Sequence, residues 1–511
     1  MDIIKTLLAN RGLKTKKQIT EFFHPTRPED LESPFDSKPA IRLIKSHIKK
    51  GHKIAIYGDY DVDGICSTAI AWETLYSQYK NVFPHIPHRE SEGYGLSIKG
   101  IDHCLAEGAK LIIAVDNGIV AHAQIKYCRD KKCDIIIIDH HETNDQRLKA
   151  NCVLHSTSSC AAGLTWLFCR DYLAPSTEHL ALVAIATICD IVPLLGPNRS
   201  FAKYGLEELN HTTRPGLLAL FEEAKLGVRY LITPYHVGFI IGPRLNAAGR
   251  LEHAIDSLRL LCTKDPSRAI QLAKQLGDTN RARQDTTLSA VTHALSEITE
   301  SSLIVAADKS YHPGVIGLVA AKLVEKYYRP AIAISIGEQE SKGSARSIPG
   351  FHITEHLRTV SHLLVDVGGH AMAAGFTITN DNLPKLLKKL NQTKIDPKLL
   401  VKKQRIDAEI SLTAIDQELM ARLKEFEPFG LSNPIPVFST FKVEISDIRR
   451  LGKDNQHLKF KAGDLEAIWF NAPGTWPLAP STCDLVYQIA EDTWNGQSKL
   501  QLLIKDVRPS S

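Results

Sequence analysis

The segment Lys53-Ile-Ala-Ile-Tyr-Gly-Asp-Tyr-Asp-Val-Asp-Gly64 is a short apolar run that ends in a turn of glycines and aspartates. Two later segments repeat this design: Leu111-Ile-Ile-Ala-Val-Asp-Asn-Gly118 and Asp134-Ile-Ile-Ile-Ile-Asp-His-His141. Runs rich in β-branched residues, separated by helical stretches, are typical of strands buried on both faces of a parallel sheet. We therefore predict an α/β fold with polar side chains at the carboxyl ends of the strands, where such sheets bind ligands.

Three carboxylates, those of Asp59, Asp61 and Asp63, alternate along the first of these turns. They would repel one another unless a cation neutralises them, and a tight glycine-bounded turn can aim two or three of them at one point. The alternatives are a solvated acidic turn and a helix cap. An EF-hand loop is excluded, because Ile70 stands where that loop requires a glutamate.

The segment Asp139-His140-His141 follows four isoleucines directly, which is hard to explain by packing alone. Imidazole and carboxylate ligands together select Mn²⁺, Zn²⁺ or Fe²⁺, and Mg²⁺ where carboxylates dominate. Asp116 ends the neighbouring run, and Asp190 ends the buried helical stretch 178–190. This set is too large for one ion. We therefore expect two ions about 3.5–4 Å apart, bridged by Asp116, in a phosphoesterase site.

Length and composition set the broad class. A chain of 511 residues with 43% apolar and 23% charged residues predicts a soluble globular protein of two to four domains. No uncharged apolar run reaches the roughly 18 residues of a membrane span, and the N-terminus lacks the order of a signal peptide. Ten scattered cysteines predict reduced thiols and a cytoplasmic location. The net charge of +5 is only weak support for a nucleic-acid partner.

Changes in the pattern of apolar and polar residues along the chain predict five parts. An N-terminal segment, 1–50, precedes a parallel-sheet domain at 51–250. A long connecting helix, 251–300, leads to a smaller α/β domain at 301–395. Alternating stretches beyond about residue 400, such as Phe441-Lys-Val-Glu-Ile and His457-Leu-Lys-Phe-Lys, predict five short strands in an OB-like β-barrel at 400–511. Aromatic residues in these strands (Phe460, Trp469, Phe470 and Tyr487) are expected mostly to pack in the barrel core.

Three further motifs combine glycines with groups that bind phosphate. Gly368-Gly369-His370 opens a glycine-rich stretch whose backbone can approach a ligand closely, and Arg346 lies in a loop of small residues. Gly242-Pro-Arg-Leu-Asn-Ala-Ala-Gly-Arg250 adds Arg244 and Arg250. A structural turn between domains is an equal alternative for this last motif.

In their order, these segments resemble the four motifs of the DHH phosphoesterase superfamily and of its associated C-terminal DHHA1 domain. More narrowly, the chain is similar to the RecJ family of bacterial single-strand-specific exonucleases, from about residue 8 to near the C-terminus. The motifs that carry this second likeness are Asn10-Arg-Gly-Leu13, Arg214-Pro-Gly-Leu217, Gly242–Arg250 and His312-Pro-Gly-Val-Ile-Gly317.

The resemblance implies 5′→3′ removal of mononucleotides from single-stranded DNA with Mn²⁺ or Mg²⁺, in DNA repair and recombination. It also implies a single-strand-binding protein and a DNA helicase as partners, and a monomer is the default. Some relatives have a metal-binding histidine where this chain has Tyr57, so water or Asp59 would replace that ligand. By position, Asp61, Asp63, Asp116, His140 and Asp190 would bind metal, with Asp59 as a direct or an indirect ligand. His141, with Asp139 beside it, would serve catalysis, and Arg346, Gly368, Gly369 and His370, with Arg244 and Arg250, would hold the strand.

Three other functions compete with this one. A relative acting on short oligonucleotides or cyclic dinucleotides would be shorter and would lack the barrel. A non-catalytic nucleic-acid-binding relative would have lost metal-binding acids, which this chain keeps. A metal-stabilised structural protein would not place its polar clusters at the ends of strands.

Overall fold

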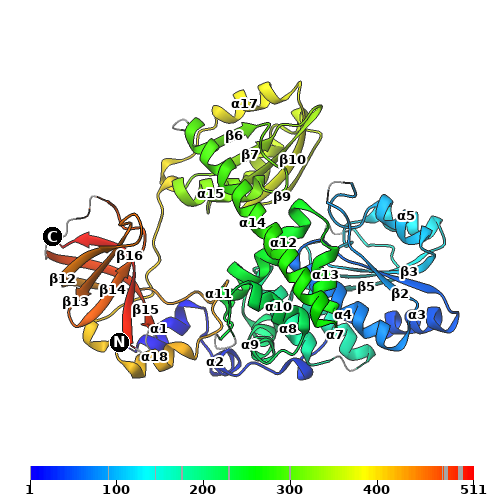
Figure 1. The fold of residues 1–511 in the computed structure, drawn as a ribbon, viewed down its shortest axis with the longest axis horizontal. Helices are drawn as coiled ribbons and strands as arrows, with labels where there is room; N and C mark the ends of the chain where they lie inside the picture. The colour runs from blue at the N-terminus through cyan, green and yellow to red at the C-terminus, as the bar shows by residue number, and fades with distance from the viewer. Residues whose placement is uncertain are drawn as a thin grey trace.

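Three sheets, each in its own lobe, organise the chain (Figure 1). The computed structural model describes residues 2–510 except 90, 144–145, 174–175, 228–230, 299–300, 475, 477–480 and 493–498. Within these residues no helix is both long enough and apolar enough to cross a membrane.

The first sheet contains five parallel strands in the order β2-β1-β3-β4-β5. Its central strands are buried on both faces, as their continuous apolar runs predict. The acidic and histidine segments follow β1, β3 and β4, so the parallel order brings them to one edge of the sheet. The strands are β1 (Lys53–Tyr57), β2 (Val82–His85), β3 (Ala109–Val115), β4 (Asp134–Asp139) and β5 (Cys152–His155).

Helices pack on both faces of this sheet, and further helices form a helical region beside it (Figure 1). Helix α4 begins at Val62, directly after Asp61, so its first turn includes Asp63. The helices are α3 (Lys38–Lys49), α4 (Val62–Gln78), α5 (Ile98–Ala106), α6 (His122–Asp130), α7 (Ala161–Tyr172), α8 (Glu178–Cys189), α9 (Gly196–Asn210) and α10 (Pro215–Glu223).

A one-turn helix and a π-helical turn precede the connection between the first two lobes: α11 (Pro234–His236) and η2 (Val237–Ile241). The prediction of one connecting helix over 251–300 is wrong, because the region from 242 to 297 contains three helices: α12 (Gly242–Leu251), α13 (Ile255–Cys262) and α14 (Pro266–Glu297). The chain turns before α14, where Asp265 caps the helix and Pro266 occupies its first position. Helix α14 alone leads to the second lobe (Figure 1).

The second sheet has the order β6-β7-β8-β10-β9 and is mixed. Strands β6 and β7 are parallel, and the remaining neighbours are antiparallel. The strands are β6 (Ile304–Asp308), β7 (Ala331–Ser335), β8 (Glu340–Arg346), β9 (Asp366–His370) and β10 (Ala373–Thr379), and the helices are α15 (Ile316–Tyr327), α16 (Ile353–Arg358) and α17 (Leu383–Asn391).

The third sheet closes on itself, because β12 pairs with β15 as well as with β13. All five alternating stretches of the sequence lie in this barrel, which confirms the OB-like prediction. Phe460, Trp469 and Tyr487 are buried in its core, whereas Phe470 is exposed. The elements are β11 (Ala408–Glu409), α18 (Gln417–Lys424), β12 (Phe438–Leu451), β13 (His457–Ala462), β14 (Leu465–Trp469), β15 (Ser481–Asp492) and β16 (Lys499–Pro509).

The N-terminal segment divides between two lobes (Figure 1). Helices α1 (Ile3–Asn10) and α2 (Lys16–Phe23) contribute Leu7 and Phe22 to the hydrophobic core of the barrel lobe, whereas Ile44 of α3 belongs to the core of the first sheet. Arg11 donates from Nε to the Asn433 side chain at 2.6 Å and so fixes α1 to the barrel lobe. Nothing in the local sequence pattern indicates this long-range packing.

Candidate metal centre

The loop after β1 holds its aspartates by backbone hydrogen bonds. Asp59 accepts from its neighbour Tyr60 N at 2.7 Å, and Asp61 caps α4 by accepting from Gly64 N at 3.0 Å. Asp63 accepts from Ala161 N and Ala162 N at 2.7 and 2.8 Å, at the positive end of α7. The helix-cap alternative therefore applies to Asp61, but Asp59 and Asp63 are buried and cannot belong to a solvated turn.

The loop after β3 presents Asp116 in the left-handed backbone region, with φ of 63°. Asparagine and aspartate tolerate this conformation better than other non-glycine residues. Asn117 donates to the carbonyls of Gly58 (3.1 Å) and Val115 (2.9 Å), so the loops after β1 and β3 are fixed together. Asp116 Oδ1 is buried without a hydrogen-bond partner among the described residues.

Asp139, at the end of β4, orients its neighbours. Its Oδ1 accepts from His140 N at 2.7 Å and from His141 Nδ1 at 2.8 Å, and its Oδ2 accepts from Ile119 N at 2.9 Å. Both oxygens are therefore occupied, which leaves Asp139 to position the two histidines and not to bind an ion.

His140 lies at the centre of the cluster. Its Nε2 is 3.4 Å from Asp116 Oδ1, 3.6 Å from Asp190 Oδ2 and 3.7 Å from Asp63 Oδ2. Asp190 reaches this point as the residue that ends α8, as the sequence predicts. These residues come from four segments separated by up to about 130 positions in sequence, and only the fold brings them together.

Three groups of side chains have ligand atoms within 4.8 Å of one another: Asp59, Asp61 and Asp116; Asp63, His140 and Asp190; Asp116, His140 and His141. The first two share no member, and Asp116 lies between them as the carboxylate closest to His140. Asp59 Oδ2 and Asp116 Oδ1 are buried without a hydrogen-bond partner in the described part of the chain, as oxygens that serve as cation ligands can be. This donor set fits two divalent ions.

Burial and mutual repulsion shape the protonation of these groups. Burial and the charge of Asp61 raise the pKa of Asp63 to about 7, and burial with Asp63 raises that of Asp190 to about 8. Burial and the charge of a neighbouring aspartate also raise the pKa values of Asp59 and Asp116 well above the ordinary range. The neighbour is Asp61 for Asp59 and Asp63 for Asp116. Burial and neighbouring His141 lower the pKa of His140 to about 4, so its imidazole is neutral and able to bind a metal.

His141 has the opposite character. Burial lowers its pKa, but the hydrogen bond and charge of Asp139 outweigh burial and raise the pKa to about 9. Its Nε2 lies 3.0 Å from the hydroxyl of Tyr94, and the side chain is 37% exposed. A positively charged imidazole at the open side of the cluster suits a phosphate oxygen better than a cation.

Tyr57, where some relatives have histidine, does not join the candidate ligands. It is fully buried, and its hydroxyl donates to the carbonyl of Gly95 at 3.1 Å. Asp59 instead lies in the group with Asp61 and Asp116, which leaves three carboxylates for the first ion.

Four arginines gather where the first two lobes meet, and sequence reasoning identified only two of them. Arg250 of α12 and Arg346 of β8 were predicted. Arg89, after β2, and Arg283 of α14 were missed, because neither stands in a recognisable motif. Burial first, and then the charges of the other three, lower the pKa of Arg250 to about 10. The Nε atoms of Arg89 and Arg283 are buried without hydrogen-bond partners in the described part of the chain.

The remaining residues that were predicted to bind the substrate lie in two places. Gly368, Gly369 and His370 lie exposed on β9, the edge strand of the second sheet, where Gly369 has φ of 137° and a Cβ would lie 2.3 Å from Ala373 O. Arg244 lies beside the arginine cluster, since burial first and then the charge of Arg244 lower the pKa of Arg283, but its own Nε donates to Glu223 at 2.7 Å.

The Gly242–Arg250 motif supports the metal loop in addition to contributing Arg250. Asn246 Oδ1 accepts from Val62 N at 3.1 Å, and a Cβ on Gly249 would lie 2.6 Å from Tyr60 O. The alternative of a structural turn between domains is wrong, because the motif is helix α12, but the motif does have a structural role, since α12 packs directly on the acidic loop.

Comparisons with known proteins agree with this architecture. Three family models match: "DHH family, N-terminal domain" over 53–187, "DHHA1 domain" over 300–395 and "RecJ OB domain" over 406–506. The single-stranded-DNA-specific exonuclease RecJ of Bacillus subtilis is 33% identical over 99% of this chain and 68% of its own length. That of Thermus thermophilus is 31% identical over 94% of this chain and 73% of its own length.

Solved structures agree too. The crystal structure of RecJ from Thermus thermophilus in complex with Mn²⁺ superimposes with a TM-score of 0.87 at 28% identity, covering 100% of this chain and 76% of that one. The Mg²⁺ complex of RecJ from the same organism gives a TM-score of 0.79 at 27% identity, covering 100% of this chain and 75% of that one. With its metal-fitting cluster, its three matched domains and its full-length similarity, this chain belongs to the RecJ family of single-stranded-DNA-specific exonucleases.

Proposed function

We propose that this chain is a two-metal exonuclease that hydrolyses single-stranded DNA from the 5′ end and releases 5′-mononucleotides. The observation that carries the proposal is the pair of separate ligand groups, Asp59/Asp61/Asp116 and Asp63/His140/Asp190, at one edge of the first sheet. Mn²⁺ or Mg²⁺ fits this carboxylate-rich set, and the solved RecJ structures contain these ions.

Two bound divalent ions would polarise the scissile phosphate and lower the pKa of the attacking water. The protein side chains do the rest. His141, held as a cation by Asp139, donates to a phosphate oxygen as negative charge develops during attack. Asp139 also fixes the backbone of both histidines, so that His140 keeps its position between Asp116 and Asp190.

The arginine cluster supports cleavage from a phosphorylated 5′ end. A terminal phosphate carries more charge than an internal one and needs more positive partners. Arg89 lies beside the metal loop, since its guanidinium stacks 4.5 Å from the centre of the Tyr60 ring. Arg346 approaches from the second lobe, where Gly317 leaves room for its guanidinium. A 5′-phosphate held there would place the first internucleotide phosphate toward the metal cluster.

The barrel supports the preference for single strands. OB-folds bind extended strands through phosphate contacts and base stacking. Phe441 and Phe470 are exposed on this barrel, at 52% and 55%. Arg450 of β12 instead donates to backbone carbonyls of residues 455, 473 and 474 and stabilises the barrel itself.

An assay with single-stranded DNA labelled at one end tests the proposal. With Mn²⁺, the purified protein should release labelled mononucleotide from a 5′-labelled strand at once and shorten a 3′-labelled strand progressively. Duplex DNA should be degraded poorly. His140→Ala should abolish release, whereas Ala at His211, which is exposed at the end of α9, should not. Cleavage of cyclic dinucleotides with no action on longer strands would contradict the proposal.

We also propose action in DNA repair and recombination, as a cytoplasmic monomer with a single-strand-binding protein and a DNA helicase as partners. The DNA substrate and the ten free cysteines, suited to a reducing compartment, support this setting. Affinity purification of the tagged chain from cells, with analytical ultracentrifugation of the pure protein, would test it.

A further inference from the structure

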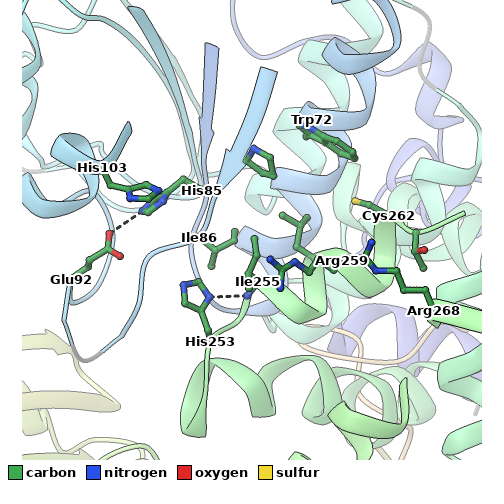
Figure 2. Close-up of a pocket in the computed structure, with 13 residues that line it drawn as sticks. Trp72, His85, Ile86, Glu92, His103, His253, Ile255, Arg259, Cys262 and Arg268 are labelled. Atoms are coloured by element: carbon green, nitrogen blue, oxygen red, sulfur yellow. Dashed lines mark hydrogen bonds and ion pairs between the residues drawn. The ribbon is translucent and has the colours of Figure 1, made fainter. Parts of the chain in front are cut away.

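A cavity of about 690 Å³ opens between β2 and α13, apart from the metal cluster (Figure 2). None of its lining residues is a candidate metal ligand or a member of the arginine cluster. Its size falls within the range of roughly 300–1,000 Å³ that is common for small-molecule sites.

The lining changes in character from one end to the other (Figure 2). Ile86 and Ile255 form an apolar middle, Trp72 lies above it, and Leu258 is a further apolar lining residue. One end carries Arg259 and Arg268. The opposite end carries three histidines and a glutamate: His85, His103, His253 and Glu92. A ligand that fits this order has an anionic group, a flat apolar body and a polar edge.

The charge balance also favours an anion. Among the described residues that line the cavity, Glu92 is the only acid, and His85 Nε2 lies 2.9 Å from it. Arg259 is paired with Asp256 at 2.8 Å but stays half exposed. Arg268 is exposed and has no hydrogen bond or ion pair with the rest of the described chain. The cavity therefore offers one free guanidinium and one partly neutralised guanidinium at the same end.

We propose that this cavity is a second binding site, which takes a nucleoside 5′-monophosphate. The phosphate lies between Arg259 and Arg268, because a guanidinium pair matches a dianion. The base lies in the apolar middle, between Ile86 and Ile255. Glu92 and His253 face the edge of the base, where a carboxylate and an imidazole can hydrogen-bond with its ring atoms.

The position of the cavity links it to the catalytic side. The connection between β2 and α5 lines the cavity with Ile86 and Glu92, and it presents Arg89 and Tyr94 to the active-site side. Glu92 braces this connection by accepting from His88 N at 3.1 Å as well as pairing with His85. A nucleotide bound in the cavity therefore contacts the same segment that positions Tyr94 against His141.

Binding of dTMP to the full chain in EDTA tests the site without metal or turnover. Because the arginine cluster can also hold a 5′-phosphate, equilibrium dialysis should count one more site in the parent chain than in Arg268→Glu, and tryptophan fluorescence should report binding beside Trp72. Arg268→Glu should weaken binding by about tenfold or more, because it reverses the charge that meets the phosphate. Lys274→Glu, the same reversal at an exposed position of the same helix, should bind like the parent chain.

Three results would overturn the proposal: no dTMP binding in EDTA, equal binding by Arg268→Glu, or equally strong binding of inorganic phosphate, which would reduce the cavity to a simple anion site. The binding assay does not depend on the exonuclease activity. A chain that binds dTMP but cleaves no DNA would contradict only the proposed function. A chain that cleaves DNA but binds no dTMP in EDTA would contradict only this inference.

Discussion

Asp116 carries a buried carboxylate in a left-handed turn, among other buried acids. Asn adopts the same backbone and keeps the size, so Asp116→Asn removes one charge and little else. Without metal, the variant should gain about 1–2 kcal/mol in free energy of unfolding, because it relieves repulsion among like charges. With Mn²⁺ it should lose exonuclease activity and most of the stabilisation that the ion confers. Urea unfolding in EDTA and in Mn²⁺ measures both.

Asp464→Asn, at an exposed turn of the barrel, is the matched control and should change neither quantity. A metal-free Asp116→Asn protein less stable than its parent would show that the carboxylates do not repel one another in the folded chain.

Arg89 is expected to recognise the 5′ end. Its Nε is buried without a described partner, so a phosphate would satisfy it. Arg89→Ala should raise KM for a 5′-phosphorylated strand by about 10–100-fold, in line with the loss of a hydrogen bond to a charged group. KM for a 5′-hydroxyl strand should change much less. Arg129→Ala, an exposed position of α6, is the control, and an equal loss on both strands would argue against a role in end recognition.

At the scale of secondary-structure elements, Glu73 joins α4, α8 and the start of α10. It accepts from Arg214 Nη1 at 3.0 Å and pairs with His179 Nε2 at 2.7 Å, while Arg214 itself is buried. Burial raises the pKa of Glu73, but these two partners outweigh burial and lower it to about 2. Glu73→Gln should therefore cost about 3–5 kcal/mol at neutral pH, because Arg214 is left with an uncompensated charge.

The pH dependence follows from the lowered pKa of Glu73. Its contribution is complete above pH about 4.5, the ordinary glutamate value, and is lost as pH falls toward about 2. The difference in unfolding free energy between the parent and Glu73→Gln should thus shrink between pH 5 and pH 3, as measured by urea unfolding. Glu178→Gln, a more exposed partner 3.8 Å from Arg214, should show a small difference at every pH. A difference in unfolding free energy between the parent and Glu73→Gln that stays constant with pH would contradict the lowered pKa of Glu73.

At the scale of the whole molecule, Arg199 of α9 connects the first lobe to the barrel lobe. Its Nη2 donates to the carbonyls of Phe426 and Glu427 at 3.1 and 2.9 Å, its Nε donates to Phe22 O, and its guanidinium stacks 3.7 Å from the centre of the Phe22 ring. This buried side chain sets where the barrel lies relative to the metal cluster.

Arg199→Ala should therefore loosen the barrel and raise KM for a long single strand several-fold, while kcat on a trinucleotide stays near the parent value. Small-angle scattering should show a wider distribution of sizes. Arg422→Ala, exposed on α18 of the barrel lobe, is the control. An equal loss of activity of Arg199→Ala on long and short substrates would instead show that the substitution damages the catalytic lobe.

Local pattern was sufficient to predict the strands, the turns that follow them and the acidic and histidine side chains that the structure gathers in the candidate metal centre. Strand runs and strand ends are local properties, because side-chain alternation, β-branching and glycine act over a few residues. The runs ending at Tyr57, Val115 and Asp139 became β1, β3 and β4, and the alternating C-terminal stretches became the barrel.

Tertiary structure alone decided which distant groups meet. His140 lies within 3.7 Å of three carboxylates from three other segments, and Arg89 and Arg283 join two predicted arginines between lobes. Tertiary packing also places α1 and α2 against the barrel and buries Tyr57 in the core of the first lobe. These contacts depend on how whole elements pack, so no short stretch of sequence contains them. The sequence determined the chemistry available to this protein, and the packing of its three lobes determined where that chemistry converges.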